Sequence, residues 1–158
     1  RTPYNKINIH IGGAYGDKTE SMKRFCENFK YLPESVKSRL TVENDDRDSL
    51  YSVKDLYNGV YKVIGIPIVF DYHHHRFCSG NITENEALNL AVSTWGLIKP
   101  VVHYSESRNI EQKDNSIKPQ AHSDYVYDYI NTYGHSLDIM IEAKHKELAV
   151  LKYYPNPV

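Results

Sequence analysis

Residues 67–71 read PIVFD, a short apolar and partly β-branched run that stops at an aspartate. The same pattern, an apolar run closed by a residue able to bind a metal, recurs as INIH at 7–10, LTVE at 40–43, PVVH at 100–103 and DIMIE at 138–142. The closing residues lie 28 to 39 positions apart, and one strand, one helix and two loops take about 30 residues or more. The sequence therefore predicts five consecutive βα units, closed by His10, Glu43, Asp71, His103 and Glu142.

This repeat predicts an α/β fold, a TIM-type (β/α) barrel. A complete eight-stranded barrel takes about 250 residues, whereas the chain has 158. We therefore expect a partial barrel of about five βα units, forming a single domain over residues 1–158. The active sites of such barrels are built at the carboxyl ends of the strands, so the five closing residues would lie on the functional face.

Charge and cysteine content say less about partners and cellular location. The 19 basic and 20 acidic residues give a net charge of −1, which neither indicates nor excludes a nucleic-acid partner. Cys26 and Cys78 form no CxxC pair, which predicts reduced, packed thiols and an intracellular setting, the cytoplasm, nucleoid or nucleus. No apolar stretch approaches the roughly 20 residues that cross a bilayer, and the first residues lack the apolar core of a signal peptide. We expect no membrane partner.

Four amphipathic stretches between the runs predict helices. The first spans 17–32 and is ended by Pro33, and the second spans 52–65 with Ser52 as its N-cap. The third, over 83–96, opens with a T-x-x-E capping box that begins at Thr83. A fourth is predicted over 123–134, with Gly134 as its C-cap. The polar segment 104–121 is too long for a routine loop, which favours a functional or mobile role.

The chemistry of the closing residues favours a metal centre. A single acidic residue after a strand is more often a helix cap or a surface residue. Burying an unpaired charge costs several kcal/mol, so two or three carboxylates that converge at the ends of apolar strands need a cation. Neutral imidazole together with carboxylates suits zinc, manganese or iron. Five such endings therefore predict a metal site rather than five unrelated caps.

The segments after two of the runs add further candidates. In the D-x-x-H sequence that starts at Asp71, His74 lies one helical turn on, so these two residues could ligate neighbouring ions. His73 and His75 are interpreted as surface residues or as support for the ligands. After His10, the glycines of GGAYGDK let a backbone come close, and Lys18 could meet a phosphate there.

Six strings carry a resemblance to a known family: IHIGGAYGDK, LTVENDD, VFDYHHHR, WGLIKPVVHYSE, PQAHSDYV and DIMIEAKHKE, in this order. Together they resemble the carboxyl-terminal part of UV-damage endonucleases, from about Lys6 to Leu148. Members of that family are (β/α) barrels related to endonuclease IV. They hold a cluster of divalent ions and nick DNA immediately 5′ of ultraviolet photoproducts. The resemblance thus implies a DNA repair endonuclease, with damaged double-stranded DNA as its partner.

The resemblance also implies roles for individual residues. Glu43 matches the carboxylate that bridges the ions. The ligands of one ion match Asp71, His103 and Glu142, which with Glu43 form the expected catalytic set. The ligands of a second ion match His74 and His122. His10 matches a histidine bound to or beside the cluster. Two or three ions are implied, with manganese expected and zinc as the alternative.

This chain departs from the family pattern in two ways. The family has a lysine two residues before the histidine of its HYS motif, where this chain has Val101 and the nearest lysine is Lys99. Two further histidine ligands and the residues that probe the damage come from strands before the one that ends at His10. The partner that completes the site would be the missing amino-terminal half of the barrel or a self-associating copy.

Seven residues are DNA-contact candidates. Four are cations that we expect near the phosphates: Lys18, Arg76, Arg108 and Lys144. Three are tyrosines beside ligands that could stack on a base or sugar: Tyr15, Tyr72 and Tyr104.

Two alternatives stay open at this stage. A metal-dependent sugar isomerase or epimerase of the same barrel type would use Glu43, Asp71, His103 and Glu142, but it leaves His74 and His122 without a role. A non-catalytic fragment that lacks the amino-terminal half is the other alternative.

Overall fold

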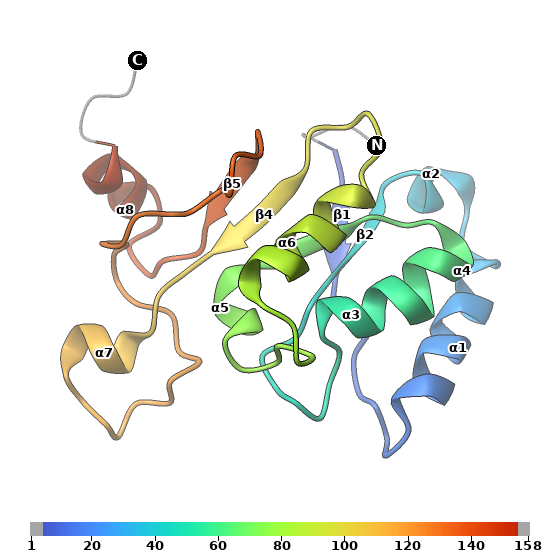
Figure 1. The fold of residues 1–158 in the computed structure, drawn as a ribbon, viewed down its shortest axis with the longest axis horizontal. Coiled ribbons are helices and arrows are strands. Elements are labelled where there is room, and N and C mark those ends of the chain that lie inside the picture. The colour runs from blue at the N-terminus through green and yellow to red at the C-terminus, as the bar shows by residue number, and fades with distance from the viewer. Residues whose placement is uncertain (1–4, 155–158) are drawn as a thin grey trace.

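The computed structural model describes residues 5–154, which contain one five-stranded sheet (Figure 1). Its strands are β1 (Ile7–Ile9), β2 (Leu40–Glu43), β3 (Ile68–Asp71), β4 (Val101–Tyr104) and β5 (Asp138–Ile141). All neighbouring pairs are parallel, and the strand order follows the chain. The five predicted strands are therefore confirmed, and β1 and β5 are the two edges of the sheet.

The strands are staggered in the way that curvature into a barrel requires. Glu43 pairs with Val69, two residues short of Asp71. His103 pairs with Met140, two residues short of the last predicted donor. Such a stagger accompanies the tilt of strands around a barrel axis. The described sheet is half of a barrel, and the predicted partial TIM-like fold is confirmed to that extent, while closure into a complete barrel stays a prediction.

The helices follow the strands along the chain. After β1 and β2 come α1 (Lys18–Phe29), α2 (Glu34–Lys37), α3 (Val53–Leu56), the π-helical turn η1 (Tyr57–Tyr61) and α4 (Lys62–Ile64). After β3, β4 and β5 come α5 (Tyr72–His75), α6 (Glu84–Ser93), α7 (Arg108–Gln112) and α8 (Lys146–Tyr153). The predicted caps at Ser52 and Thr83 are confirmed, and each forms a reciprocal capping box.

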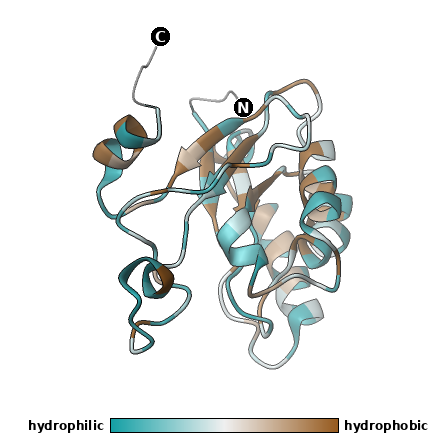
Figure 2. Cartoon of the chain, turned by 60° about the vertical axis from the view of Figure 1, so that its left-hand side comes forward, coloured by the Kyte–Doolittle hydropathy of each residue, from teal (hydrophilic) through white to brown (hydrophobic). Residues whose placement is uncertain are grey.

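The hydrophobic core lies between the sheet and the helices that cover one of its faces. Val42, Phe70 and Val102 point to this side and are at most 1% exposed, packing with buried residues of α1, α3 and α6. Figure 2 shows the strands as mainly hydrophobic and the surrounding loops as mainly hydrophilic. Residues alternate between the two faces of a strand, so the predicted donors point to the other side. On that side Val69 and Val101 form a small cluster.

The second helix differs from its prediction by one turn of π-helix. At this turn, a Cβ on Gly59 would lie 2.5 Å from Sδ of Met22 in α1. With glycine here, the Met22 side chain packs directly against the turn, and a larger residue would force that side chain to move. The helical spacing of Val53, Leu56 and Val60 still buries all three completely.

The fourth predicted helix, over 123–134, is wrong. This segment is an irregular loop in which Val126 and Ile130 are buried, and their helical spacing is what the prediction rested on. The nearby helix is α7, which forms inside the segment predicted to be a polar loop. Gly134 does adopt a left-handed conformation, with φ of 83°, but it closes a turn and no helix.

Carboxylates explain why this segment is not helical. Glu106 accepts hydrogen bonds from the backbone amides of Tyr127 and Asp128, both at 2.9 Å. The Glu111 carboxylate likewise accepts from two consecutive amides, at 2.7 and 3.0 Å. These side chains satisfy the N–H groups that would otherwise bond to carbonyls one turn earlier.

Two further expectations concern the cysteines and the membrane. Cys26 and Cys78 are buried free thiols, as predicted. Within residues 5–154, no helix has the length and apolar character needed to span a membrane.

Candidate metal centre

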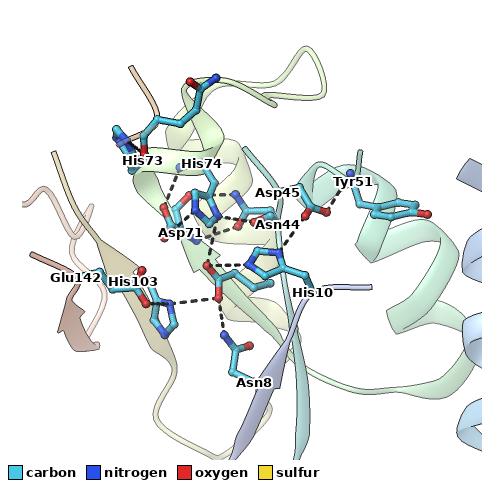
Figure 3. Close-up of polar contacts among 12 residues, drawn as sticks. Asn8, His10, Asn44, Asp45, Tyr51, Asp71, His73, His74, His103 and Glu142 are labelled. Carbon is cyan, nitrogen blue, oxygen red and sulfur yellow. Dashed lines mark hydrogen bonds and ion pairs between the residues drawn. The ribbon is translucent and has the colours of Figure 1, made fainter. Parts of the chain in front are cut away.

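Glu43 lies at the centre of the predicted cluster. It ends β2 and is 4% exposed, and its two carboxylate oxygens lie near different histidines. Figure 3 shows these histidines, His10, His74 and His103, gathered in one region at the ends of the strands. Oε1 is 3.3 Å from Nδ1 of His74 and 3.7 Å from Nε2 of His10. Oε2 is 3.2 Å from Nδ1 of His103. A carboxylate with donors on both sides has the placement needed to bridge two ions.

Two sets of possible ligand atoms share this carboxylate. One set consists of His10, Glu43 and His74, and the other of Glu43, Asp71 and His103, with the atoms of each set within 4.8 Å of one another. The strand register explains the second set, because Asp71 and His103 pair directly across β3 and β4.

Two buried atoms indicate that these residues suit a cation. Oδ2 of Asp71 and Nδ1 of His103 have no partner of hydrogen-bond geometry within the described chain, although leaving a buried polar atom unpaired is costly. Atoms that each lie about 2.1 Å from one ion are themselves about 3 to 3.5 Å apart. Nδ1 of His103 lies 3.2 Å from Oε2 of Glu43 and 3.1 Å from Oε1 of Glu142, within this range. The donor set therefore fits a divalent metal such as manganese or zinc.

Glu142 and His122 extend the cluster on the side of β5. Oε1 of Glu142 is 3.1 Å from Nδ1 of His103, and Oε2 is 3.8 Å from Nδ1 of His122. His122 is brought here by a β-bridge to Ser107, in the segment that follows β4. The rings of His122 and His74 are 6.4 Å apart. The structure thus brings all seven sequence-predicted metal residues into one connected cluster.

The backbone at the start of α5 fixes the D-x-x-H pair. Oδ1 of Asp71 caps this helix by accepting from the His74 amide at 2.8 Å, which leaves Oδ2 for another partner. Asn44, directly after β2, contacts both residues of this pair. Its side chain makes hydrogen bonds of 3.0 and 2.8 Å with the backbone of Asp71, and its carbonyl lies 2.8 Å from Nδ1 of His74.

Sequence reasoning missed three residues that hold the donors: Asn8, Asn44 and Asp45. Asn8 donates to Oε2 of Glu43, and Oδ1 of Asp45 is 3.0 Å from Nδ1 of His10. Asn8 lies two residues before one donor and Asp45 two residues after another. Residues two apart on a strand share a face, so this offset is the signal that could have identified Asn8.

Burial and charge shift the pKa values of the cluster in opposite directions. Burial lowers the pKa of His103, but the carboxylates of Glu142 and Glu43 outweigh it and raise this pKa to about 10. Burial raises the pKa of Asp71 to about 6, against the opposing effect of His74. For Glu43 burial acts upward, yet the neighbouring histidines, His103 first, hold its pKa below the usual value. A proton and a metal ion therefore compete for the same atoms.

The other two histidines of the triplet are buried supporting residues and lie away from the surface. His73 is fully buried, its Nε2 is 3.2 Å from the Gln120 carbonyl, and burial lowers its pKa to about 4. His75 packs against Phe70, with ring centroids 5.5 Å apart, and burial lowers its pKa as well.

The DNA-contact candidates divide by exposure. Tyr72 and Tyr104 are 1% and 3% exposed, so the expectation that they stack on a base was wrong. They follow the strand ends but turn into the core. Tyr15, in contrast, is 88% exposed. Among the cations, Lys18 and Arg108 lie 3.5 and 3.6 Å from the carboxylates of Asp55 and Asp124, while Arg76 and Lys144 are exposed.

Sequence comparison relates this chain to one family of known proteins. A sequence profile of the family described as UV-endonuclease UvdE matches residues 1–156. The chain belongs to the UvdE family. UV DNA damage endonucleases of Bacillus mycoides (strain KBAB4) and Bacillus cereus (strain G9842) are 37% and 38% identical to it, over 156 and 159 residues. Each alignment covers 92% of this chain and 46% of the relative.

A solved member has the same fold. The crystal structure of SacUVDE superposes with a TM-score of 0.75 and 34% identity, covering 96% of this chain and 53% of that one. The UvdE-family chain described here thus spans about half the length of the relatives it matches.

One expected UvdE-family feature has no counterpart in this chain. Val101, at the position of the family lysine, is 4% exposed and packs with Val69 and Trp95. Lys99 cannot replace it, because its ammonium is 2.7 Å from the carboxylate of Asp138. Val101 begins β4 and Asp138 begins β5, so the valine and this ion pair lie at the end of the sheet opposite the metal cluster.

Proposed function

We propose that this chain is the carboxyl-terminal half of a metal-dependent DNA repair endonuclease that nicks the strand 5′ of ultraviolet photoproducts. Membership of the UvdE family supports the repair endonuclease. The observation that carries the proposal is the buried Glu43 carboxylate, which is shared by two sets of metal-ligating atoms. The sugar isomerase alternative gains no support from the relatives.

The proposed ligands divide around Glu43. Asp71, His103 and Glu142 would hold one ion, as the resemblance implies, and His74 would help to hold a second. Ligand atoms of His10 and His74 lie within 4.8 Å of Glu43 and of each other, which supports placing His10 on that second side. His122 lies between the second side and Glu142 and would serve a second or third ion. Manganese is the proposed metal, with zinc as the alternative.

When bound, divalent ions at this site would polarise a phosphodiester and lower the pKa of water. The protein's own residues prepare the donors. Asp45 accepts from Nδ1 of His10, so Nε2 keeps its lone pair facing Glu43. The Asn44 carbonyl has the same effect on His74, whose Nε2 then faces Oδ2 of Asp71 at 3.8 Å.

The binding partner would be damaged double-stranded DNA, lying across the carboxyl ends of the strands. Lys18, Arg76, Arg108 and Lys144 are the proposed phosphate contacts, and an intracellular location is proposed with this role. Because the chain spans about half of its relatives, the missing strands would complete both the barrel and the ligand set.

A nicking assay on the natural full-length chain that contains residues 1–158 tests the proposal. A UV-irradiated, end-labelled duplex should be cut only with added Mn²⁺, and the new end should map immediately 5′ of the photoproduct. The same duplex without irradiation is the control. Equal cutting of both duplexes, or no cutting with any divalent ion, would refute the assignment.

A further inference from the structure

The turn after β1 presents an aromatic side chain that the fold itself does not use. The Tyr15 side chain is 88% exposed, and its hydroxyl has no hydrogen-bond or ion-pair partner among residues 5–154. Its backbone φ is 49°, in the left-handed region that side chains with a Cβ disfavour. Glycine, asparagine and aspartate are the usual residues at such a position. A strained, exposed tyrosine therefore points to a use outside the chain.

The base of this turn is anchored. The Ala14 carbonyl accepts hydrogen bonds from the Asp17 amide at 2.9 Å and from the Ser21 hydroxyl at 2.8 Å. The preceding carbonyl, of Gly13, accepts from the hydroxyl of the fully buried Tyr51 at 3.3 Å. In Figure 1 the turn belongs to the blue loop that runs from β1 to the start of α1. The backbone that carries Tyr15 is thus held in place before any ligand binds.

The ring orientation is also set. A Cβ on Gly13 would meet the Tyr15 ring at 3.2 Å, so the ring lies against this glycine and a larger residue there would push it slightly outward. With one side resting on Gly13, the exposed remainder is available to a planar ligand.

A hollow of about 490 Å³ adjoins the ring, within the size range of small-ligand sites. Its lining includes Tyr15, Lys18, Ser49 and Leu50. The Lys18 ammonium adds a positive charge, 3.5 Å from the Asp55 carboxylate. Because the turn begins just after His10, the hollow lies at the same edge of the sheet as the metal donors.

We propose that Tyr15 is a stacking platform for an unpaired nucleobase, with Lys18 beside the phosphate of the same strand. This inference rests on the proposed function, since it assigns DNA as the ligand. An aromatic ring stacks on any base, because every base has a π-face, and an exposed platform needs a base that has left the duplex. The platform would hold the displaced strand over the metal donors.

A second tyrosine with a left-handed backbone, Tyr133, has partners within the fold. Tyr133 has φ of 50°, but its hydroxyl donates to Glu84 at 3.0 Å and its amide donates to Asn131 at 2.9 Å. The fold accounts for Tyr133 and leaves Tyr15 without such an account.

The test uses single-stranded oligonucleotides with 2-aminopurine at successive positions, whose fluorescence is quenched when the base stacks. They are titrated with the natural full-length chain without added metal. Wild type and Tyr15→Phe should quench the probe at one position. Tyr15→Asn tolerates the left-handed backbone, and it should lose the quenching and bind roughly 5- to 150-fold more weakly. Tyr31→Ala, which removes a tyrosine 87% exposed in the turn after α1, is the matched control and should behave as wild type.

The outcomes separate this inference from the proposed function. Quenching that survives Tyr15→Asn with affinity within twofold, or no quenching at any probe position by wild type, would overturn the platform. Quenching that depends on Tyr15 in a protein that cuts no irradiated DNA would keep the platform and refute the nuclease.

Discussion

Asn8 on β1 donates a hydrogen bond from its side-chain amide to Oε2 of Glu43 on β2. The Thr41 hydroxyl donates to Oδ1 of Asn8 at 3.0 Å, which fixes the direction in which the amide faces. The central carboxylate is therefore oriented by the protein independently of any ion. Partners of this kind, behind the ligands, commonly determine metal affinity.

Replacing Asn8 should weaken metal binding without unfolding the chain. We expect Asn8→Ala to lower Mn²⁺ affinity by about 10- to 100-fold, because Glu43 loses its only amide donor from β1. Asn8→Asp should lower the affinity further, since it places a second carboxylate against Glu43, and one of the two must then be protonated. Calorimetric titration with Mn²⁺ measures both, and Asn28→Ala on the exposed side of α1 is the control. Unchanged affinity in Asn8→Ala would show that the hydrogen bond does not position Glu43.

Glu142→Gln should abolish metal-dependent nicking in the natural full-length chain and leave the circular dichroism spectrum unchanged. The amide keeps the volume of the side chain but removes the negative charge that faces His103 and His122. We also expect weaker Mn²⁺ binding, by about tenfold or more, as for loss of a charged ligand. Near-normal cutting at low Mn²⁺ would exclude Glu142 as a ligand.

Metal affinity should rise with pH. The His103 pKa is about 10 and the Asp71 pKa about 6, so at pH 7 a proton occupies His103 and must leave when an ion binds. Each proton released makes the affinity about tenfold higher per pH unit, a rise that ends once pH exceeds the pKa of the group involved. Mn²⁺ titrations from pH 6 to pH 9 in buffers of different ionisation enthalpy measure both the affinity and the released protons. Affinity independent of pH across this range would contradict the proposed competition.

The strand pattern was predictable because it depends on short-range rules. An apolar run closed by a polar residue every 28 to 39 positions specifies where strands end, and parallel order then brings those ends together. The same pattern predicts His10, Glu43 and Asp71 as neighbours, because each closes one of these runs.

The helix prediction failed where carboxylates from elsewhere in the chain accept hydrogen bonds from backbone amides. The spacing of Val126 and Ile130 is helical, and both are buried as that spacing predicts. The helix is absent because Glu106 and Glu111 take its amide groups, and nothing in a local pattern shows that these carboxylates will reach them. Asn44 and Asp45 were missed for a related reason, since their role depends on which strand pairs with β2.

Removing Glu106 should loosen the loop over residues 123–134. Glu106→Ala would remove the charged acceptor of two partly buried hydrogen bonds, those from the amides of Tyr127 and Asp128, and hydrogen bonds to charged groups contribute about 1.5 to 3 kcal/mol each. We expect the free energy of unfolding to fall by about 2 to 4 kcal/mol, with greater protease sensitivity near residues 123–134. Urea unfolding of the natural full-length chain measures the loss, and Glu27→Ala on α1 is the control. A loss equal to that of the control would mean that Glu106 does not hold this loop.

The last prediction concerns the two open edges of the sheet. β1 and β5 each lack a neighbour on one side in the described structure, and a groove of about 620 Å³ runs along β5, with Ile139, Met140 and Val150 in its lining. An unpaired edge of an apolar sheet is a template for pairing with another chain. We therefore expect isolated residues 1–158 to self-associate and not to cut irradiated DNA, whereas the chain completed by the missing strands should be a metal-dependent nuclease.

Met140→Lys tests this directly, because Met140 is 50% exposed on the edge strand and a lysine there discourages pairing. Sedimentation velocity of isolated residues 1–158 should show this variant shifted toward monomer. Leu97→Lys, which places the same charge on a fully exposed leucine in the turn before β4, should associate as wild type does. A wild-type chain that stays monomeric over the whole concentration range would show that the edges are protected, and a variant that associates as strongly as wild type would place the contact elsewhere than β5.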